Sequence, residues 1–273
     1  MKQAMCSISS KAEVMPGVHL IWIDAPEIAA MAKPGQFVTV RCGDFMLRRP
    51  FSIHQVGSSS VIASEAKQSQ VGILFNVAGK GTLWLSQQEA GQRIDVLGPL
   101  GKGFTIAPES KKLLLVAGGI GVAPLVFLMH QASSRHEVIL IHGARTAAQL
   151  LPNDYQPGAI SRERVRFITV TEDGSAGQKG KATDVLPDYL DWADQLYACG
   201  PVDMYKAMAQ MSLPAKRSNL KLKESQISLE VRMGCGFGAC YCCTIDTKKG
   251  LQRVCRDGPV FELDHIIWQE VRL

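Results

Sequence analysis

The 273 residues suffice for two domains, or two and a small third, and a composition of 46% hydrophobic and 20% charged residues indicates a packed globular protein rather than a disordered one. The net charge of +5 is scattered, without a basic stripe interleaved with aromatic residues, so no nucleic-acid partner is expected. Neither a signal-peptide pattern nor an apolar run of bilayer length is found, so the eight cysteines favour a metal centre in a reducing cytoplasm, away from membranes.

Residues 1–105 are predicted to form the first domain, an antiparallel β-barrel or sandwich. Short β-rich runs alternate with glycine and proline there, as is typical of such folds. The Ser-rich segment 57–70 interrupts the rhythm and is predicted to be a long surface loop. The predicted strands are 18–23, 36–42, 51–56, 71–77 and 93–97.

Two segments of this domain could bind phosphate. In Leu47-Arg48-Arg49-Pro50-Phe51-Ser52-Ile53, a guanidinium and a hydroxyl could hold a diphosphate beside a flat ring, although Arg-Pro before a strand is more often a plain strand entrance. In Ala78-Gly79-Lys80-Gly81-Thr82, the glycines and the hydroxyl suit a backbone nest for a phosphate. An ordinary turn before a helix over 83–89 is the alternative for this second segment.

Residues 106–211 are predicted to form a second, Rossmann-like α/β domain. A strand over 113–117 runs into the turn Gly118-Gly119-Ile120-Gly121 and an apolar helix to about residue 131, an arrangement that suits a pyrophosphate at the helix N-terminus. The match to G-x-G-x-x-G is imperfect because Pro124 stands at the third glycine. Further strands are predicted at 137–142, 164–170 and 195–198, and their carboxyl ends are where ligands bind in open α/β sheets. Cys199 follows the last one, either as a buried apolar cysteine or as a site residue.

Residues 212–273 are predicted to be a linker, 212–225, and a small cysteine-rich module. The spacing C-x4-C-x2-C-x11-C is the plant-type pattern for one [2Fe–2S] cluster, and glycines around it let backbone N–H groups approach the sulfides. A zinc site usually presents two short C-x2–4-C pairs, so zinc is the less favoured alternative, and a disulfide framework is less favoured still. Cys242 could replace the third ligand, but the spacing would then not match. The predicted ligands are Cys235, Cys240, Cys243 and Cys255.

Together these segments resemble the ferredoxin-NADP-reductase-like flavoproteins, and most closely the electron-transfer subunits of type B, NAD-dependent dihydroorotate dehydrogenase. The resemblance spans nearly the whole chain. Cys242 stands where a glycine is usual, and Asn76 where a larger polar residue such as Arg is common. The most specific matches are Ser228-Leu229-Glu230-Val231-Arg232-Met233-Gly234-Cys235-Gly236 and Cys255-Arg256-Asp257-Gly258-Pro259-Val260-Phe261.

The resemblance implies an antiparallel FAD-binding β-barrel, a nicotinamide-binding domain and a [2Fe–2S] module, with no catalytic acid or base on this chain. FAD would be lined by Arg49, Pro50, Phe51, Ser52, Leu74, Phe75, Asn76, Gly81 and Thr82. NAD would lie against Gly119 and Gly121, with its nicotinamide near Cys199, Gly200 and Pro201.

The implied activity is electron transfer in pyrimidine biosynthesis. An FMN-containing catalytic subunit, in a heterotetramer of two of each chain, would oxidise dihydroorotate, and electrons would pass through the cluster and FAD to NAD+. One alternative is the electron-transfer subunit of another reductase, such as a ferredoxin:NAD(P) oxidoreductase, sulfite reductase or hydrogenase. A non-catalytic zinc-binding interaction protein is the alternative from a different class.

Overall fold

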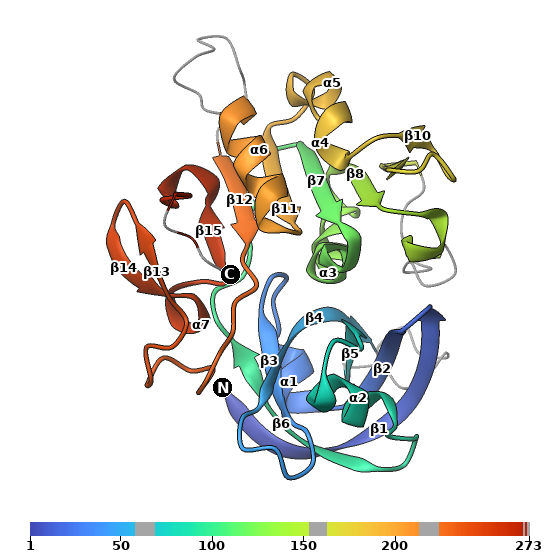
Figure 1. The fold of residues 1–273 in the computed structure, drawn as a ribbon, viewed down its shortest axis with the longest axis vertical. Coiled ribbons are helices and arrows are strands. Elements are labelled where there is room, and N and C mark those ends of the chain that lie inside the picture. Colours follow the sequence, from blue (N-terminus) through green and yellow to red (C-terminus); the bar gives the residue numbers. More distant parts are fainter. Residues whose placement is uncertain (58–68, 153–162, 213–223, 270, 272–273) are drawn as a thin grey trace.

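The computed structural model describes residues 1–57, 69–152, 163–212, 224–269 and 271, which form a barrel and an α/β sheet packed against each other (Figure 1). Across these ranges, no helix is long and apolar enough to cross a membrane. Residues 58–68 of the predicted surface loop and 213–223 of the predicted linker lie outside the described residues.

The N-terminal body is a closed antiparallel barrel with the strand order β1-β2-β5-β4-β3-β6. Its interior is filled by alternating apolar side chains, among them Ile21, Val38 and Ile73, none of which is exposed. Closure leaves no free strand edge, because β1 pairs with both β2 and β6. The elements are β1 (Lys2–Met15), β2 (Val18–Asp24), α1 (Pro26–Met31), β3 (Phe37–Arg41), β4 (Arg49–Gly57), β5 (Gln70–Asn76), α2 (Lys80–Ser86) and β6 (Arg93–Leu100).

The predicted barrel is confirmed, with differences in two elements. The prediction missed β1, because serines and lysines interrupt its apolar alternation and its pairing with β2 and β6 defines it instead. The helix predicted at 83–89 is α2 and begins earlier, at Lys80, because the Thr82 hydroxyl closes its first turn. Thr82 Oγ1 accepts hydrogen bonds from the amides of Ala78, at 2.8 Å, and Gly79, at 3.0 Å.

The second body is a seven-stranded sheet with the order β10-β9-β8-β7-β11-β12-β15, parallel except for β15. Its central strands are apolar along their length, as expected for strands covered on both faces. Helix α3 packs on one face, and α4, α5 and α6 pack on the other. The elements are β7 (Lys112–Gly118), α3 (Val122–Ala132), β8 (Glu137–Ala144), β9 (Val165–Thr171), β10 (Gln178–Lys179), α4 (Ala182–Val185), α5 (Pro187–Leu190), β11 (Gln195–Cys199), α6 (Val202–Ser212), β12 (Glu224–Ser228) and β15 (Val260–Glu262).

The C-terminal segment leaves this sheet and returns to it. Between β12 and β15 the chain forms the cysteine-bearing loop, the hairpin of β13 (Thr244–Thr247) and β14 (Gly250–Arg253), and the short helix α7 (Val254–Asp257). Glu224 and Ser225, predicted as linker, are the first residues of β12, whose partner β11 was not visible from the local sequence.

Helix α3 joins the two bodies, lying between the sheet and the barrel (Figure 1). Phe127 of α3 belongs to the apolar core of the barrel, while Leu74 of β5 packs with the residues under the sheet. His54 of β4 is buried and its Nδ1 donates a hydrogen bond of 2.9 Å to the carbonyl of Ala123. The carboxyl ends of the parallel strands therefore face strand β4 of the barrel.

Candidate functional site

The predicted pyrophosphate turn lies against the loop that follows β11. Strands β7 and β11 are paired with Ala117 opposite Cys199, so both glycine loops leave the same edge of the sheet. A Cβ on Gly121 would stand 2.1 Å from the carbonyl oxygen of Cys199, and one on Gly118 would stand 2.7 Å from Cδ of Pro201. The absence of side chains is therefore what allows the two loops to touch, and the structure brings the predicted residues of this site together.

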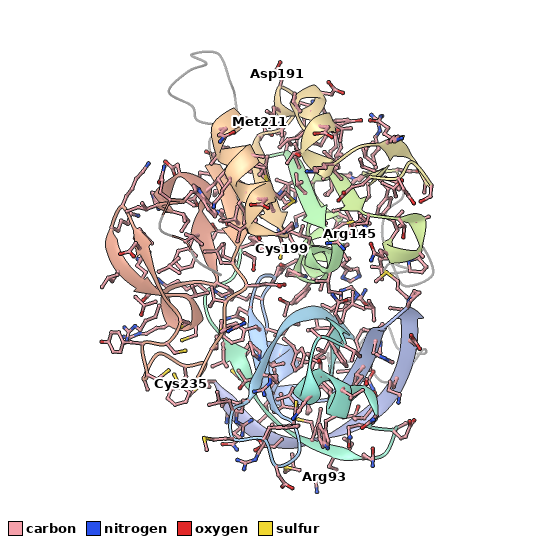
Figure 2. The ribbon with its side chains drawn as sticks, viewed as in Figure 1. Arg93, Arg145, Asp191, Cys199, Met211 and Cys235 are labelled. Carbon is pink, nitrogen blue, oxygen red and sulfur yellow. The ribbon has the colours of Figure 1, made fainter. Side chains whose placement is uncertain are left out.

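Cys199 itself is fully buried beneath this contact, and its label marks the edge of the sheet that faces the barrel (Figure 2). Burial raises the pKa of its thiol well above the usual value. Its neighbour Tyr205 accepts a hydrogen bond of 2.8 Å from the amide of Gly200 and donates one of 2.6 Å to the carbonyl of Ser228. Cys199 thus contributes backbone to the loop, while its side chain packs as a neutral thiol.

His142, at the end of β8, was not singled out from the sequence. Its Nε2 donates a hydrogen bond of 3.1 Å to the carbonyl of Gly119, and burial lowers its pKa to about 4, against the opposing effect of that hydrogen bond. The ring is therefore neutral and fixes the carbonyl of the glycine turn. The rule that ligands bind at the carboxyl ends of parallel strands could have drawn attention to it.

The predicted flavin segments lie on the neighbouring strands β4 and β5. The rings of Phe51 and Phe75 meet edge to face, with centroids 5.3 Å apart, which fixes the two segments relative to each other. Arg49 donates a hydrogen bond of 2.7 Å to the carbonyl of Leu47. The Arg49 side chain also covers Gly81, where a Cβ would stand 2.8 Å from Nε.

The remaining residues of this group continue the same surface. Ser52 is half-buried on β4, and Asn76 is exposed at the end of β5. Thr82 is committed to capping α2, so its hydroxyl shapes the loop rather than standing free. Arg49 and Gly81 thus lie side by side, as binding of a diphosphate would need, whereas the rings of Phe51 and Phe75 are buried in the barrel core.

The four predicted ligand cysteines form two pairs. The amide of Cys235 donates to Sγ of Cys240 at 3.3 Å, and the amide of Cys255 donates to Sγ of Cys243 at 3.4 Å. Figure 2 marks Cys235 beside the barrel, at the side of the sheet where β12 and β15 lie. A [2Fe–2S] cluster needs two thiolates on each iron, so this division fits it.

The pKa values of Cys235 and Cys255 differ because their surroundings differ. Burial would raise the pKa of Cys235, but amides of Phe237, Cys240 and Ala239 lower it to about 6. Burial, together with the hydrogen bond and charge of Cys243, raises the pKa of Cys255 to about 12. A metal deprotonates a coordinating thiol outright, so both can serve as thiolate ligands.

Glycines let the loop fold closely around its sulfurs. A Cβ on Gly234 would stand 3.1 Å from Sγ of Cys240, and one on Gly238, at a φ of +94°, would stand 2.9 Å from Cδ of Arg256. Gly236, at a φ of +79°, lies against the barrel, where its Cβ would stand 2.8 Å from Cγ2 of Thr39. Thr39 was not predicted, and no local signal in the sequence could have indicated a contact across almost 200 residues.

Two observations bear on the alternative ligand sets. Within the ranges that the structure describes, no group of three His, Cys, Asp or Glu side chains is close enough to hold a metal ion. Cys242 is exposed, and its Sγ lies 4.0 Å from the carbonyl oxygen of Arg232 rather than in either cysteine pair. Cys242 thus takes part in neither of the two hydrogen-bonded cysteine pairs.

Two protein families match this chain. The family described as the iron-sulfur cluster binding domain of dihydroorotate dehydrogenase B matches residues 230–267, and the oxidoreductase NAD-binding domain matches residues 115–210. The first range contains both cysteine pairs, and the second contains the Gly121–Cys199 contact.

Curated relatives match over nearly the full length. The dihydroorotate dehydrogenase B (NAD(+)) electron transfer subunit of Desulforamulus reducens is 38% identical over 266 residues, covering 94% of this chain and 95% of that protein. The protein of the same description from Geobacillus thermodenitrificans is 37% identical over 249 residues, covering 88% and 89%.

Solved structures share the fold. One from a study of the NADH-dependent reduced ferredoxin-NADP oxidoreductase has a TM-score of 0.80 and 27% identity, covering 97% of this chain and 91% of its own. A ferredoxin NADP+ reductase from Neisseria gonorrhoeae with bound FAD and NADP has a TM-score of 0.64 and 21% identity, covering 84% and 98%. These likenesses confirm the predicted combination of barrel and α/β sheet.

Proposed function

The chain belongs to the family of electron transfer subunits of dihydroorotate dehydrogenase B (NAD(+)), and on this premise we propose that Cys235, Cys240, Cys243 and Cys255 hold its [2Fe–2S] cluster. The resemblance that the sequence suggested is thereby confirmed. The chain is an oxidoreductase subunit that transfers electrons in pyrimidine biosynthesis, using FAD, a [2Fe–2S] cluster and NAD. The observation that carries the ligand assignment is the division of the four cysteines into two pairs.

The chain's own residues hold and orient these groups. Arg49 and Gly81 would hold the diphosphate of FAD, Ser52 would lie near its ring, and the buried Phe51–Phe75 pair would support β4 and β5 from the core. The glycine turn would receive the pyrophosphate of NAD against the Cys199 loop. When bound, the cluster exchanges single electrons, and the flavin pairs two of them for hydride exchange with NAD. Neutral His54 and His142 hold backbone carbonyls, so neither is assigned proton transfer.

The exposed surface around the cysteine loop is the proposed contact with the catalytic subunit. Phe237 and Tyr241 of the cysteine loop are 49% and 66% exposed, and Leu251 of β14 is 72% exposed. Lys248 and Lys249 stand at the turn of the β13–β14 hairpin, the end away from Cys243 and Cys255. Exposed aromatic and aliphatic side chains beside a bound electron carrier suit a protein interface. We define these five residues as the cluster face, and we propose an assembly of two copies of each chain.

Reversing the charge of both lysines of the cluster face should weaken the complex. We expect Lys248→Glu with Lys249→Glu to raise the Kd for the catalytic subunit by about tenfold or more at low salt, because rim charges steer and orient association. The matched control is Lys179→Glu with Lys181→Glu, at and just beyond β10, the opposite edge of the sheet. The Kd of each double variant for the catalytic subunit is measured by calorimetric titration. Equal Kd values for the two variants would contradict the proposed face.

The function is tested anaerobically with both chains. The FAD- and iron-loaded chain is mixed with an FMN-containing dihydroorotate dehydrogenase catalytic subunit from the same source, and NADH formation from dihydroorotate and NAD+ is followed at 340 nm. NADH from the mixture but from neither chain alone, with co-elution at the mass of two copies of each, supports the proposal. Full cofactor occupancy without NADH formation would instead favour a ferredoxin:NAD(P) oxidoreductase, which reduced ferredoxin as donor would reveal.

A further inference from the structure

Thr39 occupies the point where the flavin-bearing barrel and the cysteine loop meet. It lies on β3, paired with Pro50 of β4 on one side and with Leu97 of β6 on the other. Its neighbours Val38 and Val40 belong to the barrel core, so the alternation of the strand turns Thr39 outward. Its Cγ2 then stands 2.8 Å from where a Cβ of Gly236, the residue after Cys235, would lie.

The barrel surface around Thr39 belongs to the same apolar core as the second cysteine pair. Phe37 and Leu100, on the same outer side of the barrel, share one apolar core with Cys243 and Cys255. Leu100 also reaches the loop, with Cδ1 4.0 Å from the Cβ position of Gly236. The cysteine loop therefore packs against the barrel surface formed by β3 and β6.

The hydroxyl of Thr39 is buried without a partner. The residue is 1% exposed, and Oγ1 has no hydrogen-bond partner in the part of the chain that the structure describes. A buried hydroxyl is ordinarily satisfied, so an orphan donor beside a ligand-binding loop points to a group that arrives with the ligand. The methyl group packs against Gly236, and the hydroxyl is the one polar group of the Thr39 side chain.

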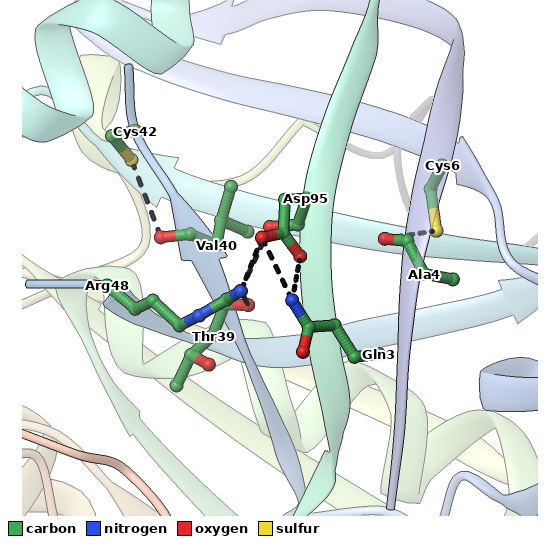
Figure 3. A network of polar contacts seen from close by, with 8 residues as sticks. All are labelled: Gln3, Ala4, Cys6, Thr39, Val40, Cys42, Arg48 and Asp95. Carbon is green, nitrogen blue, oxygen red and sulfur yellow. Dashed lines mark hydrogen bonds and ion pairs between the residues drawn. The ribbon is translucent and has the colours of Figure 1, made fainter. Parts of the chain in front are cut away.

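A polar network holds the backbone of Thr39 in place (Figure 3). Arg48 pairs with the carboxylate of Asp95, which also accepts a hydrogen bond of 3.1 Å from Nε2 of Gln3. The same guanidinium donates to the carbonyl oxygens of Asp95, at 3.2 Å, and Thr39, at 3.5 Å. The network holds the backbone of Thr39 and leaves its hydroxyl unused.

We propose that the Thr39 hydroxyl donates a hydrogen bond to a sulfur of the iron–sulfur cluster and thereby raises the reduction potential of the cluster. This inference rests on the proposed function, because it requires the cluster in the cysteine loop. Reduction adds negative charge to the sulfurs, so a donor stabilises the reduced form more than the oxidised form. Thr39 is a positioning residue: it belongs to the flavin-bearing barrel, adjusts the reduction potential of the cluster and does not contact substrate.

The test is an anaerobic redox titration of the loaded full chain, followed by electron paramagnetic resonance. Thr39→Val removes the hydroxyl and keeps the shape, whereas Thr39→Ser keeps the hydroxyl and removes the methyl. We expect Thr39→Val to disfavour cluster reduction by about tenfold, which is about 59 mV for a one-electron couple. Thr39→Ser should stay within about twofold of the unaltered chain.

The other outcomes are equally defined. Equal potentials in Thr39→Val and the unaltered chain, equal shifts in both variants, or a shift of the flavin potential alone would overturn the proposal. If Thr39→Val fails to hold the cluster, Thr39→Ala is the second hydroxyl-free variant. Loss of the cluster from both, with retention in Thr39→Ser, supports the hydrogen bond. An unaltered chain that binds FAD but gives no [2Fe–2S] signal would overturn the cluster assignment itself.

Discussion

Replacing Cys240 with Ala is expected to abolish the iron–sulfur cluster and with it all dihydroorotate-dependent formation of NADH. Cys240 is one of the two thiols of the first pair, and its Sγ accepts the amide hydrogen bond of Cys235. Without Cys240, one iron would have a single protein thiolate, and the cluster would have three protein ligands in place of four. The flavin and nicotinamide sites lie on other elements, so reduction of a dye by NADH should continue.

Cys242 provides the matched control, since both cysteines are exposed and they are separated by one residue. Cys242→Ala should keep the full content of iron and acid-labile sulfide, the resonance spectrum of the reduced cluster and the activity with the catalytic subunit. Iron analysis and the spectrum of each variant are the measurements. Loss of the cluster in Cys242→Ala would contradict the ligand set. If Cys240→Ala also loses the cluster, Cys242 replaces the third ligand, Cys243, and if Cys240→Ala retains it, Cys242 replaces the second.

The spacing of the cysteines indicates a ligand set because the pattern is local in the chain, and that set stays a prediction. It could not predict which thiols pair, since the pairing of Cys243 with Cys255 depends on the hairpin of β13 and β14 between them. The contact of Gly236 with Thr39 was likewise hidden, because it joins the loop to a barrel strand far away in the sequence.

For the fold too, local elements could be predicted from the sequence, whereas pairings between distant strands could not. Strands such as β7 are apolar throughout and end in glycine turns, so their type and position follow from the sequence. The choice between a barrel and a sandwich depended on β1, whose mixed composition carries no clear alternation and whose pairing with β6 closes the sheet. Strand β12 has the same dependence on a distant partner, β11.

Replacing Gly121 with Ala is expected to impair the nicotinamide site strongly while leaving FAD bound. The added Cβ would stand 2.1 Å from the carbonyl oxygen, 2.4 Å from the carbonyl carbon of Cys199 and 2.8 Å from the amide of Gly200. These are backbone atoms of a paired strand, so no side chain can move aside to relieve the clash. Overpacking of this kind costs about 1–3 kcal/mol, which lowers Tm by roughly 2–4 °C for each kcal/mol in a chain of this size.

The effect on function should exceed the effect on stability, because separating the two loops displaces both sides of the predicted site. We expect KM for NADH in dye reduction to rise by about tenfold or more. Gly91→Ala, between α2 and β6 of the barrel, is the control: its φ of +89° strains a side chain, at a cost of about 1 kcal/mol, but no atom lies within 4 Å of its Cβ position and the residue is outside the nicotinamide site. Steady-state kinetics, flavin content and thermal unfolding of both variants distinguish damage to the nicotinamide site from a general loss of stability. Equal changes in KM would mean that a general loss of stability, and not the close approach of Gly121 to Cys199, impairs the binding of NADH.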